Sequence, residues 1–349
     1  MTKHIFMTWN LGFAARKKNF IPDDHQRASK IAMVIEACQA EVIALQEMAN
    51  RSYLNDTSFS LEQFFRIQVP CSFVHFEPAL SLGSRHFYPF GKIEELRQKF
   101  GIVKQEQGPG IWHCPRQGID QLHLRNLYSD QAYLAHVEVS RPMPHPLYMG
   151  DKINFKNVGR DEEDRPILWA RFSQWDYNES REKGLKLYFL SIQLPTLRGE
   201  REIPEKEISS ERQQEIRDVT LGLANVARID KLGSKLRVYC LHHIISQAKR
   251  IENYWEKWGT HKCVFIFAGD FNFEHTTQPS EYILLESHGY SPVKNTGPTR
   301  QSGSLIDNIW VKGIERTKIA EIDLSSKSIK PANLNELSDH YPVMAEIDL

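Results

Sequence analysis

The sequence predicts a single α/β domain, and three observations support this prediction. Short apolar runs rich in β-forming residues alternate with stretches that have the period of an amphipathic helix. Several of these runs end in polar or acidic residues. The length of 349 residues suits one large domain or two ordinary ones, but the chain has no internal repeat, low-complexity tract or Gly/Ser linker. We therefore expect one domain over residues 1–349.

The first elements follow the order strand, helix, strand. A short apolar run at residues 5–9 predicts a strand that ends at Asn10. Apolar residues then recur at positions 31, 34, 35 and 38, which is the stripe of an amphipathic helix. A second apolar run at residues 42–45 predicts a buried strand that ends at Gln46 and Glu47. This order is typical of an α/β fold.

The later part of the chain returns to the same alternation after a long interruption. Residues 50–164 have a poor pattern with many Pro, Gly and His residues, so we expect long loops and short strands there rather than a separate domain. Further strands are expected at residues 167–172, 187–192, 264–268 and 343–347 and from Leu305 onwards, and helices at residues 211–229 and 237–258.

Composition and charge exclude some classes of protein. Hydrophobic residues make up 41% of the chain and charged residues 25%, which is enough to bury a core. Lys plus Arg and Asp plus Glu are equal at 44 each. A protein that coats nucleic acid without specificity normally has a basic excess. The zero net charge therefore argues against that class, although it leaves room for a local basic groove.

The cysteines and the N-terminal residues indicate a compartment. The five cysteines are odd in number, scattered and without a C-x-x-C pair, which argues against a disulfide framework and a structural zinc site. No apolar segment of a signal peptide precedes His4, and no run approaches the ~18 apolar residues of a membrane helix. We expect a cytoplasmic protein without a transmembrane segment, and the sequence indicates no protein partner.

Polar residues at the ends of the predicted strands form the candidate site. Four clusters share this position: Asn10, Glu47, Asp270 with Asn272, and Asp339 with His340. α/β folds place their functional residues at strand ends, next to loops. Hard oxygen ligands without thiolates suit Mg²⁺, with Mn²⁺ as a substitute. Mg²⁺ keeps coordination positions for substrate oxygens, such as those of a phosphate ester.

Five sequence motifs together resemble a known family. They are TWNLG at residues 8–12, ALQEM at 44–48, GDFN at 269–272, LIDNIWV at 305–311 and SDHYPV at 338–343. Each motif is weak alone, but their order and their positions at strand ends resemble the endonuclease/exonuclease/phosphatase (DNase I-like) superfamily. The resemblance implies a four-layered DNase I-like α/β sandwich, in which two packed mixed β-sheets are flanked by helices. It also implies that residues 50–164 are a family-variable loop region.

The resemblance implies a Mg²⁺-dependent phosphodiesterase and assigns a metal shell. Glu47 would be the main metal ligand, with Asn10 and Asp339 nearby in the metal and phosphate shell. A cation over the non-bridging oxygens of a phosphate lowers the energy of the charge that develops during in-line attack. The alternative for Glu47 is a surface carboxylate that caps the following segment.

The resemblance also assigns the proton-transferring groups. Asp270, helped by Asn272, would orient and deprotonate the attacking water. His340, held by the carboxylate of Asp307, would contact the phosphoryl oxygen, and the carboxylate would favour the cationic imidazole. The alternatives are a turn after a buried strand for Asp270 and Asn272, and a structural histidine at the base of the last strand for His340.

One position departs from the pattern of the family. Residues 189–196 resemble the strand that ends in Thr-His-Leu, and Gln193 stands in the place of the histidine. An amide donates hydrogen bonds but carries no positive charge and transfers no proton. Losing a charged donor costs about 10²–10³ in rate when nothing replaces it. The abasic-site endonuclease branch has a tyrosine there, so a catalytic role for Gln193 and a catalytically weakened binding module both stay open.

The substrate is expected to be nucleic acid, acted on as an endo- or exonuclease. Arg16, Lys17 and Lys18 follow Asn10 and would clamp a phosphate chain, unless they form an ordinary solvated loop. Trp310 would stack on a base or sugar, unless it packs in the core. The alternative substrates are a lipid, an inositol phosphate or another small phosphoester. The histidines of residues 50–164 match no zinc template.

Overall fold

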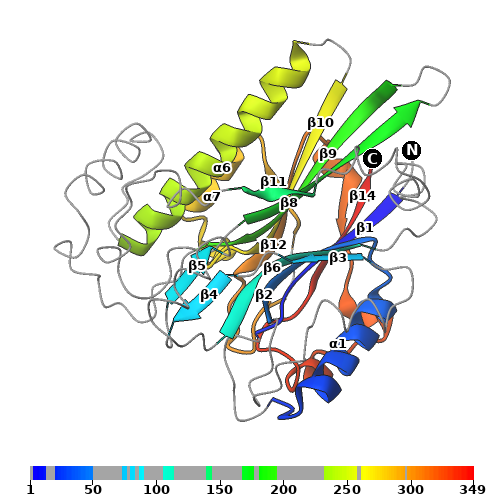
Figure 1. Ribbon diagram of the computed structural model, residues 1–349, viewed down its shortest axis with the longest axis vertical. Helices are drawn as coiled ribbons and strands as arrows, with labels where there is room; N and C mark the ends of the chain where they lie inside the picture. Colours follow the sequence, from blue (N-terminus) through cyan, green and yellow to red (C-terminus); the bar gives the residue numbers. More distant parts are fainter. Residues whose placement is uncertain are drawn as a thin grey trace.

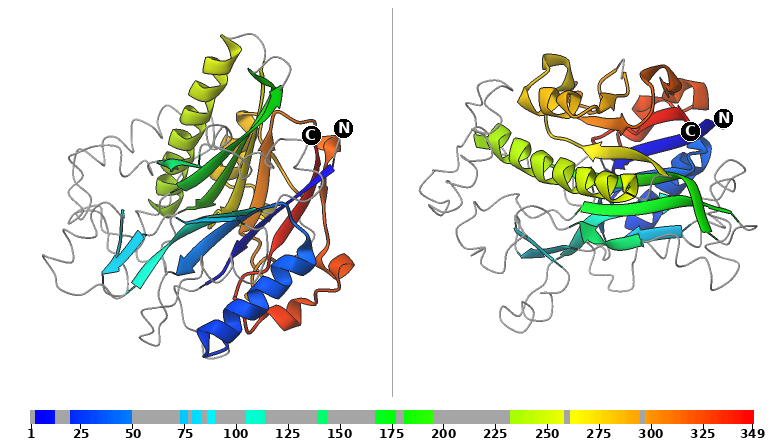
Figure 2. Two further views of the ribbon diagram at one scale, coloured as in Figure 1. Left: turned by 45° about the vertical axis from the view of Figure 1, so that its right-hand side comes forward. Right: turned by 90° about the horizontal axis from the view of Figure 1, so that it is seen from above.

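The structure is a computed structural model, and it consists of two mixed β-sheets packed face to face (Figure 1). It describes residues 3–12, 20–49, 73–76, 79–82, 86–89, 105–113, 139–143, 167–176, 181–194, 232–257, 261–294 and 297–349. Within these residues the helices lie on the two outer faces of the sheets (Figure 2). The expected α/β sandwich is therefore confirmed.

The first sheet is built around a parallel pair of strands from the N-terminal region. Its strands are β1 (Lys3–Asn10), β2 (Val42–Ala49), β3 (Phe73–Phe76), β4 (Ala79–Leu82), β5 (His86–Pro89), β6 (Gln105–His113), β13 (Ile319–Glu321) and β14 (Val343–Asp348). The spatial order is β13-β14-β1-β2-β6-β4-β5, with β3 also paired to β6. β1 and β2 run parallel with Asn10 opposite Gln46, and β14 runs antiparallel to β1.

The second sheet has the order β11-β12-β10-β9-β8-β7. Its strands are β7 (Val139–Met143), β8 (Ile167–Asp176), β9 (Arg181–Gln193), β10 (His261–Asp270), β11 (Ser291–Pro292) and β12 (Asp307–Lys312). β9 and β10 run parallel and end together, with Asp270 opposite Gln193. β12 runs antiparallel to β10, so that its first residue, Asp307, lies opposite Asp270.

The core between the sheets is formed by alternate residues of the central strands. Phe6 of the first sheet and Phe189 of the second stack with their ring centroids 5.8 Å apart. The same buried cluster contains Ala44 of β2, Ile266 of β10 and Ile309 of β12. Successive side chains of a strand point to opposite faces. One set of residues on each strand therefore faces the other sheet, and the remaining set faces a helix.

Three helices cover the outer faces of the sheets in the described part of the chain. α1 (Asp24–Cys38) packs on the first sheet, and its first turn is capped by the side chain of Asp23, which accepts from the backbone N–H of Gln26. α6 (Leu232–Glu256) and α7 (Ser280–Ser287) pack on the second sheet. Among these helices none is both long and apolar enough to span a membrane.

Most predicted elements are present, and their limits differ from the prediction in a few places. The strand expected at residues 187–192 is longer, since β9 begins at Arg181. The short α7 was not predicted, because eight residues give too few turns for a clear period. Strands β3 to β7 fall within residues 50–164, where short strands were expected. The helix predicted at residues 211–229 lies outside the described residues.

Candidate active site

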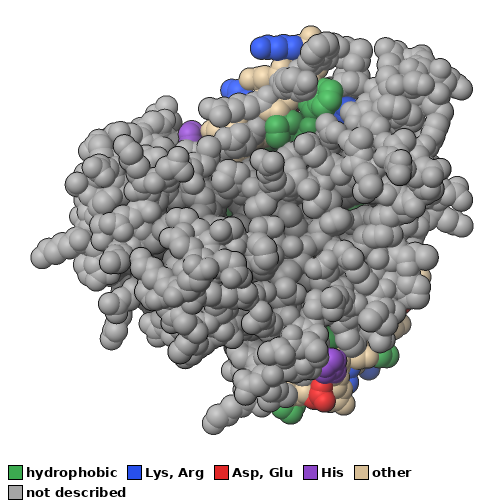
Figure 3. Space-filling model, in the orientation of Figure 1, with side chains coloured by type: hydrophobic (Ala, Val, Ile, Leu, Met, Phe, Trp, Pro, Cys, Tyr) green, Lys and Arg blue, Asp and Glu red, His purple; other side chains and the backbone are tan. Residues whose placement is uncertain are grey.

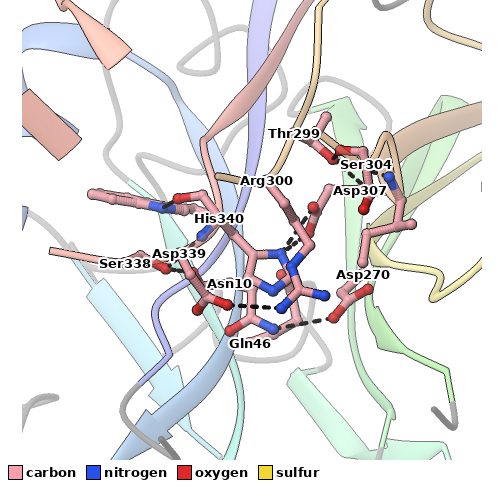
Figure 4. Close-up of polar contacts among 12 residues, drawn as sticks. Asn10, Gln46, Asp270, Thr299, Arg300, Ser304, Asp307, Ser338, Asp339 and His340 are labelled. Atoms are coloured by element: carbon pink, nitrogen blue, oxygen red, sulfur yellow. Dashed lines mark hydrogen bonds and ion pairs between the residues drawn. The ribbon is translucent and has the colours of Figure 1, made fainter. Parts of the chain in front are cut away.

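The candidate active site lies where strand ends of both sheets meet (Figure 4). Parallel strands end at the same edge of a sheet, and antiparallel neighbours begin there. The residues at this edge are Asn10 (end of β1), Glu47 (β2), Gln193 (end of β9), Asp270 (end of β10), Asp307 (start of β12), and Asp339 and His340 (before β14). Separate segments, as far apart in the chain as residues 10 and 340, therefore converge on one place.

The period of two along each strand explains which side chains reach this place. On β10, Ile266 and Ala268 belong to the core between the sheets, and Asp270 continues their series. On β12, Ile309 and Val311 belong to the same core, and Asp307 stands two residues before Ile309. These two carboxylates thus lie at the polar rim of the layer that packs the two sheets together.

Asn10 connects the two sheets through hydrogen bonds to two carboxylates. Its Nδ2 lies 3.3 Å from Oε1 of Glu47 and 3.2 Å from Oδ2 of Asp270, and donates to both. Its Oδ1 accepts from the backbone N–H of Gly12 at 3.0 Å. Asn10 is 1% exposed. A buried amide with both ends engaged holds a fixed orientation, so Asn10 sets the relative position of the two carboxylates.

Glu47 reaches the site because β2 is irregular at this point. Ile43 and Leu45 face the helix side of the first sheet, so strict alternation would turn Glu47 toward α1 as well. The pairing of β2 with β6 shifts between Leu45 and Met48, and Glu47 has a φ of 52°. β-bulges re-aim side chains in this way, and positive φ is costly for a non-glycine residue. The irregularity directs the carboxylate of Glu47 to the rim.

The structure places the side-chain amide of Gln193 on a carboxylate. Nε2 of Gln193 donates to Oε1 of Glu47 at 2.8 Å, and Gln193 is 6% exposed. The sequence pattern suggested a donor aimed at the phosphate, whereas this hydrogen bond orients Glu47. Asn10 and Gln193 thus donate to the same carboxylate oxygen.

Asp270 is held by donors on both of its oxygens. Oδ1 accepts from the backbone N–H of Asn272 at 3.0 Å, and Oδ2 accepts from Asn10 at 3.2 Å. The side-chain amide of Asn272 donates to the carbonyl of Leu194 at 2.8 Å, so its contact with Asp270 passes through the backbone. Asn272 has a φ of 52°. The segment therefore forms a turn, which was the alternative given for Asp270 and Asn272 in the sequence analysis. The same turn also orients Asp270 toward the site.

A buried carboxylate and an imidazole form the second half of the site. Nδ1 of His340 lies 3.0 and 2.9 Å from the two carboxylate oxygens of Asp307. Asp307 is fully buried and His340 is 4% exposed. Burial opposes a charge on His340, but the carboxylates of Asp307 and Asp270 outweigh this effect and raise the pKa of His340 to about 9. The imidazole is therefore cationic at neutral pH.

Two hydroxyl residues that were given no role in the sequence analysis hold this pair in place: Ser338, the first residue of the SDHYPV motif, and Thr299, outside the motifs. Oγ of Ser338 donates to the carbonyl of Asn10 at 2.6 Å and accepts from the backbone N–H of His340 at 3.1 Å. Oγ1 of Thr299 accepts from the backbone N–H groups of Ile306 and Asp307, both at 3.0 Å. Serine and threonine are common in turns, so nothing in the sequence distinguishes Thr299 from the other hydroxyl residues, whereas the motif could have drawn attention to Ser338.

A cation at the site was also missed from the sequence. Arg300 follows Thr299, and its NH2 group donates to Oδ2 of Asp339 at 2.7 Å. The only sequence signal is one arginine in the polar turn at residues 297–304. Asp339, expected near the metal and the phosphate, is thus paired with a guanidinium group.

The donor set at this edge fits a hard divalent cation. The ligand atoms of Asp270, Asp307 and His340 all lie within 4.8 Å of one another. This group contains neither Glu47 nor Asp339, the two carboxylates expected as metal ligands from the sequence. Glu47 joins this group through Asn10, whose amide contacts both carboxylates. Carboxylate and amide oxygens suit Mg²⁺ or Mn²⁺ rather than a thiophilic metal.

Two groups of residues were predicted to bind the substrate, and the structure describes one of them. Trp310 is fully buried and packs against Tyr282, with the ring centroids 4.9 Å apart. Its predicted stacking on a base or sugar is wrong, and the alternative of core packing is correct. A side chain three residues after Asp307 points to the opposite face of β12, toward α6 and α7. Arg16, Lys17 and Lys18 lie outside the described residues.

The fold and the site together define a class of protein, and similarity to known proteins identifies its family. A two-sheet sandwich whose strand ends gather carboxylates, an amide and an imidazole has the architecture of DNase I-like phosphoesterases. The chain belongs to the Endonuclease/Exonuclease/phosphatase family, whose pattern it matches over residues 7–340. The members of this family are phosphoesterase hydrolases. None of the curated proteins compared matches the sequence.

Solved structures support the same fold at low sequence identity. An endonuclease/exonuclease/phosphatase from Bacteroides vulgatus is similar with a TM-score of 0.53 and 13% identity, covering 100% of both chains. One from Beutenbergia cavernae has a TM-score of 0.51 and 11% identity, covering 100% of this chain and 72% of that one. The human nocturnin catalytic domain has a TM-score of 0.50 and 11% identity, covering 99% of this chain and 93% of that one.

Proposed function

We propose that this protein is a Mg²⁺-dependent phosphodiesterase that hydrolyses its substrate by in-line attack of a water activated by Asp270. The observation that carries the proposal is the convergence of Asp270, Asn10 and Glu47 with the pair of Asp307 and His340 at one edge of the two sheets. These groups combine a proton acceptor, oxygen ligands for a cation and a positively charged donor. In-line attack on a phosphate ester needs all three.

The oxygen ligands for the cation would come from the first sheet and the turn that leads into it. Glu47 and Asn10, on the first sheet, and Asp339, before β14, would hold Mg²⁺ or Mn²⁺. Bound there, the cation neutralises negative charge on the non-bridging oxygens of the phosphate. The hydrogen bond from Gln193 fixes Oε1 of Glu47 and so orients the carboxylate for this role.

Asp270 is the proton acceptor in this proposal. Its carboxylate is held on one oxygen by a backbone N–H and on the other by the amide of Asn10. Such a group keeps one orientation, so that the proton of a water bound beside it is taken along a defined direction. A positioned general base contributes about 10²–10⁴ to the rate.

His340 stabilises the charge that develops on the phosphoryl group. Nδ1 is engaged by Asp307, so Nε2 is the nitrogen that donates toward the substrate. Asp307 fixes the ring and favours its cationic form, as the raised pKa of His340 indicates. The imidazole therefore acts as a preorganised positive donor beside the carboxylate that activates the water.

Nucleic acid is the first substrate class in this proposal, supported by the basic sequence of Arg16, Lys17 and Lys18. Trp310 no longer supports it, since it is buried. Counterion release makes nucleic-acid binding strongly dependent on salt, whereas binding of a small phosphoester is not. The slope of log KM against log salt concentration therefore separates nucleic acid from a lipid or a small molecule.

The test is hydrolysis of a generic phosphodiester and of single- and double-stranded DNA and RNA, with Mg²⁺, Mn²⁺ or EDTA. Turnover that requires the metal supports the proposal, and the substrate cleaved names the class. Turnover of the generic diester alone would replace nucleic acid with a small phosphoester. Binding without turnover of any substrate would show that the protein is the catalytically weakened module that the glutamine at position 193 left open.

A further inference from the structure

The turn that carries Arg300 is fastened to the segment that carries Asp339 and His340. Arg300 and His340 form an isolated antiparallel bridge. The backbone N–H of Tyr341 donates to the carbonyl of Thr299 at 2.8 Å, and that of Gln301 donates to the carbonyl of Asp339 at 3.0 Å. The backbone of Arg300 is therefore fixed relative to the catalytic residues on both sides, as a residue of a rigid site would be.

The guanidinium group of Arg300 lies among the carboxylates of the site. Its NH2 group donates to Oδ2 of Asp339 at 2.7 Å, and Asp270 and Asp307 also attract its charge. Figure 4 shows it between the carboxylates of Asp339 and Asp270. The side chain of Arg300 keeps 32% of its surface exposed, whereas that of Asp339 keeps 9%. The group is therefore anchored at one end and open to an incoming ligand.

The donors of Arg300 are not all used. A guanidinium group has five N–H donors in one plane. Among the described residues, the NH2 group is the one guanidinium nitrogen of Arg300 with a hydrogen-bond partner. Nε is buried, so the donors that an incoming ligand can reach are those of the terminal nitrogens on the exposed part of the side chain. Phosphate matches this planar fork with two parallel hydrogen bonds, which a lysine or an amide does not reproduce. A tetrahedral oxyanion is thus the ligand chemistry that the unused donors fit.

The other residues of the site leave a need for a second cationic side chain, besides His340, to balance the charge of a phosphoryl group. Gln193, where the family pattern has a histidine, carries no charge, and its amide N–H is donated to Glu47. In the part of the chain that the structure describes, His340 and Arg300 are the cationic side chains found among the site carboxylates. The positive charge that the end of β9 does not supply is present on Arg300, beside Asp339.

We propose that Arg300 binds the phosphoryl group of the substrate, held in position by Asp339, and supplies the positive charge that Gln193 lacks. This inference rests on the proposed phosphoesterase function and deepens it. Arg300 is then a catalytic residue that contacts the reacting group. Asp339 is, in addition, the positioning residue that holds the guanidinium plane toward the site.

The test compares Arg300→Gln and Arg300→Lys with the wild type. Lys262→Gln is the matched control, since Lys262 is an exposed cation near the other end of β10. For Arg300→Gln we expect kcat/KM to fall by about 10²–10³, with a decrease in kcat and an increase in KM. For Arg300→Lys we expect an intermediate loss, because the charge remains and the planar fork does not. Lys262→Gln should match the wild type.

A second readout is independent of turnover. Calorimetric titration with inorganic phosphate, in the presence of Mg²⁺, should give an affinity at least about tenfold weaker in Arg300→Gln than in the wild type. An unchanged phosphate affinity in a folded Arg300→Gln variant would overturn the inference, because a purely structural arginine would give that result. If Arg300→Gln does not fold, Arg300→Lys carries the test, and an unchanged phosphate affinity there overturns the inference equally.

The two proposals fail in different ways. A wild-type protein that binds phosphate through Arg300 but hydrolyses no phosphoester would refute the proposed function and leave the phosphate-binding role standing. A wild-type protein that hydrolyses a phosphoester, with Arg300→Gln equally active and equally tight for phosphate, would refute the role of Arg300 alone.

Discussion

At the scale of single residues, the orientation of the Glu47 carboxylate depends on two neighbouring amides. Oε1 receives N–H donors from Gln193 at 2.8 Å and from Asn10 at 3.3 Å. The backbone of Glu47 is held at a φ of 52°, which a glutamate rarely adopts without support from its surroundings. The sequence departure at position 193 therefore has a structural consequence besides the loss of a charge.

Removing the amide at position 193 is expected to weaken metal binding more than the chemical step. Partners that orient a metal ligand contribute about 10–100-fold to metal affinity. In Gln193→Ala we expect the Mg²⁺ concentration for half-maximal activity to rise by about tenfold, with kcat at saturating Mg²⁺ changed much less. The Mg²⁺-induced increase in Tm should shrink in parallel. Equal Mg²⁺ dependence in the variant and the wild type would show that Gln193 does not orient a metal ligand.

His275 gives the protein an expected pH dependence of stability that does not involve the site. Burial among Phe271, Phe273 and Trp310 lowers the pKa of His275 to about 3. In the unfolded chain it has its ordinary pKa of about 6.5. Between these two values only the unfolded chain takes up the proton, so the free energy of unfolding falls as the pH decreases.

Through this one residue, the free energy of unfolding changes by about 1.4 kcal/mol per pH unit below pH ~6. We expect His275→Phe to remove that part of the slope in urea denaturation between pH 6.5 and 4.5. His25→Gln is the control, because His25 is exposed on α1, and its slope should equal that of the wild type. An identical slope in His275→Phe and the wild type would contradict the assignment.

At the scale of elements, a buried arginine on α1 connects the helix to two segments of the site. Arg27 is 2% exposed. Its NH2 group donates to the carbonyl of Leu11 at 2.5 Å, and its Nε donates to the carbonyl of Leu337 at 2.7 Å. Leu11 follows Asn10, and Leu337 precedes Ser338. One side chain on the outer helix thus supports both loops that bring site residues from the first sheet.

We expect Arg27→Met to destabilise the fold and to reduce activity. Two buried carbonyls lose charged donors, which costs about 3 kcal/mol or more in the free energy of unfolding. The control is Lys30→Met on the same helix, since Lys30 pairs with Glu336 at the surface and such pairs contribute at most about 1 kcal/mol. Urea denaturation measures both. If Arg27→Met lowers the free energy of unfolding no more than Lys30→Met does, the hydrogen bonds from Arg27 to the two carbonyls do not hold the loops.

A glycine at the end of β10 shows how closely the strands approach there. A Cβ at position 269 would lie 1.7 Å from the carbonyl oxygen of Ile192. Glycine is therefore required for β9 and β10 to bring Gln193 and Asp270 side by side. The Gly in GDFN thus has a packing reason that is separate from the chemistry of the aspartate.

At the scale of the whole molecule, the sequence was sufficient for what depends on local pattern. Apolar runs located the central strands, and polar residues at their ends located Asn10, Glu47 and Asp270. Strict alternation along β12 also excludes a shared face for Asp307 and Trp310, which are three positions apart. The alternation therefore favours the core position that the sequence analysis gave as the alternative for Trp310.

The remaining features depend on contacts between residues far apart in the chain. Arg300 contacts Asp339 across 39 positions, and Gln193 contacts Glu47 across 146. No period or spacing reports such pairs. The bulge that directs Glu47 to the site is likewise set by pairing with β6, in a region where the sequence pattern was poor. Partners and orientations in the site therefore needed the structure, whereas its location did not.

The most direct test of the central claim is a comparison of two aspartates in similar local settings. Asp270 and Asp323 each accept a hydrogen bond from the backbone N–H two residues later, at 3.0 and 2.9 Å. Asp270 lies in the site, whereas Asp323 is exposed. Each is changed to asparagine, and kcat, KM and Tm are measured with saturating Mg²⁺ on the substrate that the wild type cleaves.

If Asp270 activates the attacking water, Asp270→Asn lowers kcat by at least about 10², with KM and Tm close to those of the wild type. Asp323→Asn keeps full activity. A folded Asp270→Asn variant whose kcat equals that of Asp323→Asn would contradict the account, since the carboxylate at the centre of the converging strands would then have no part in the reaction.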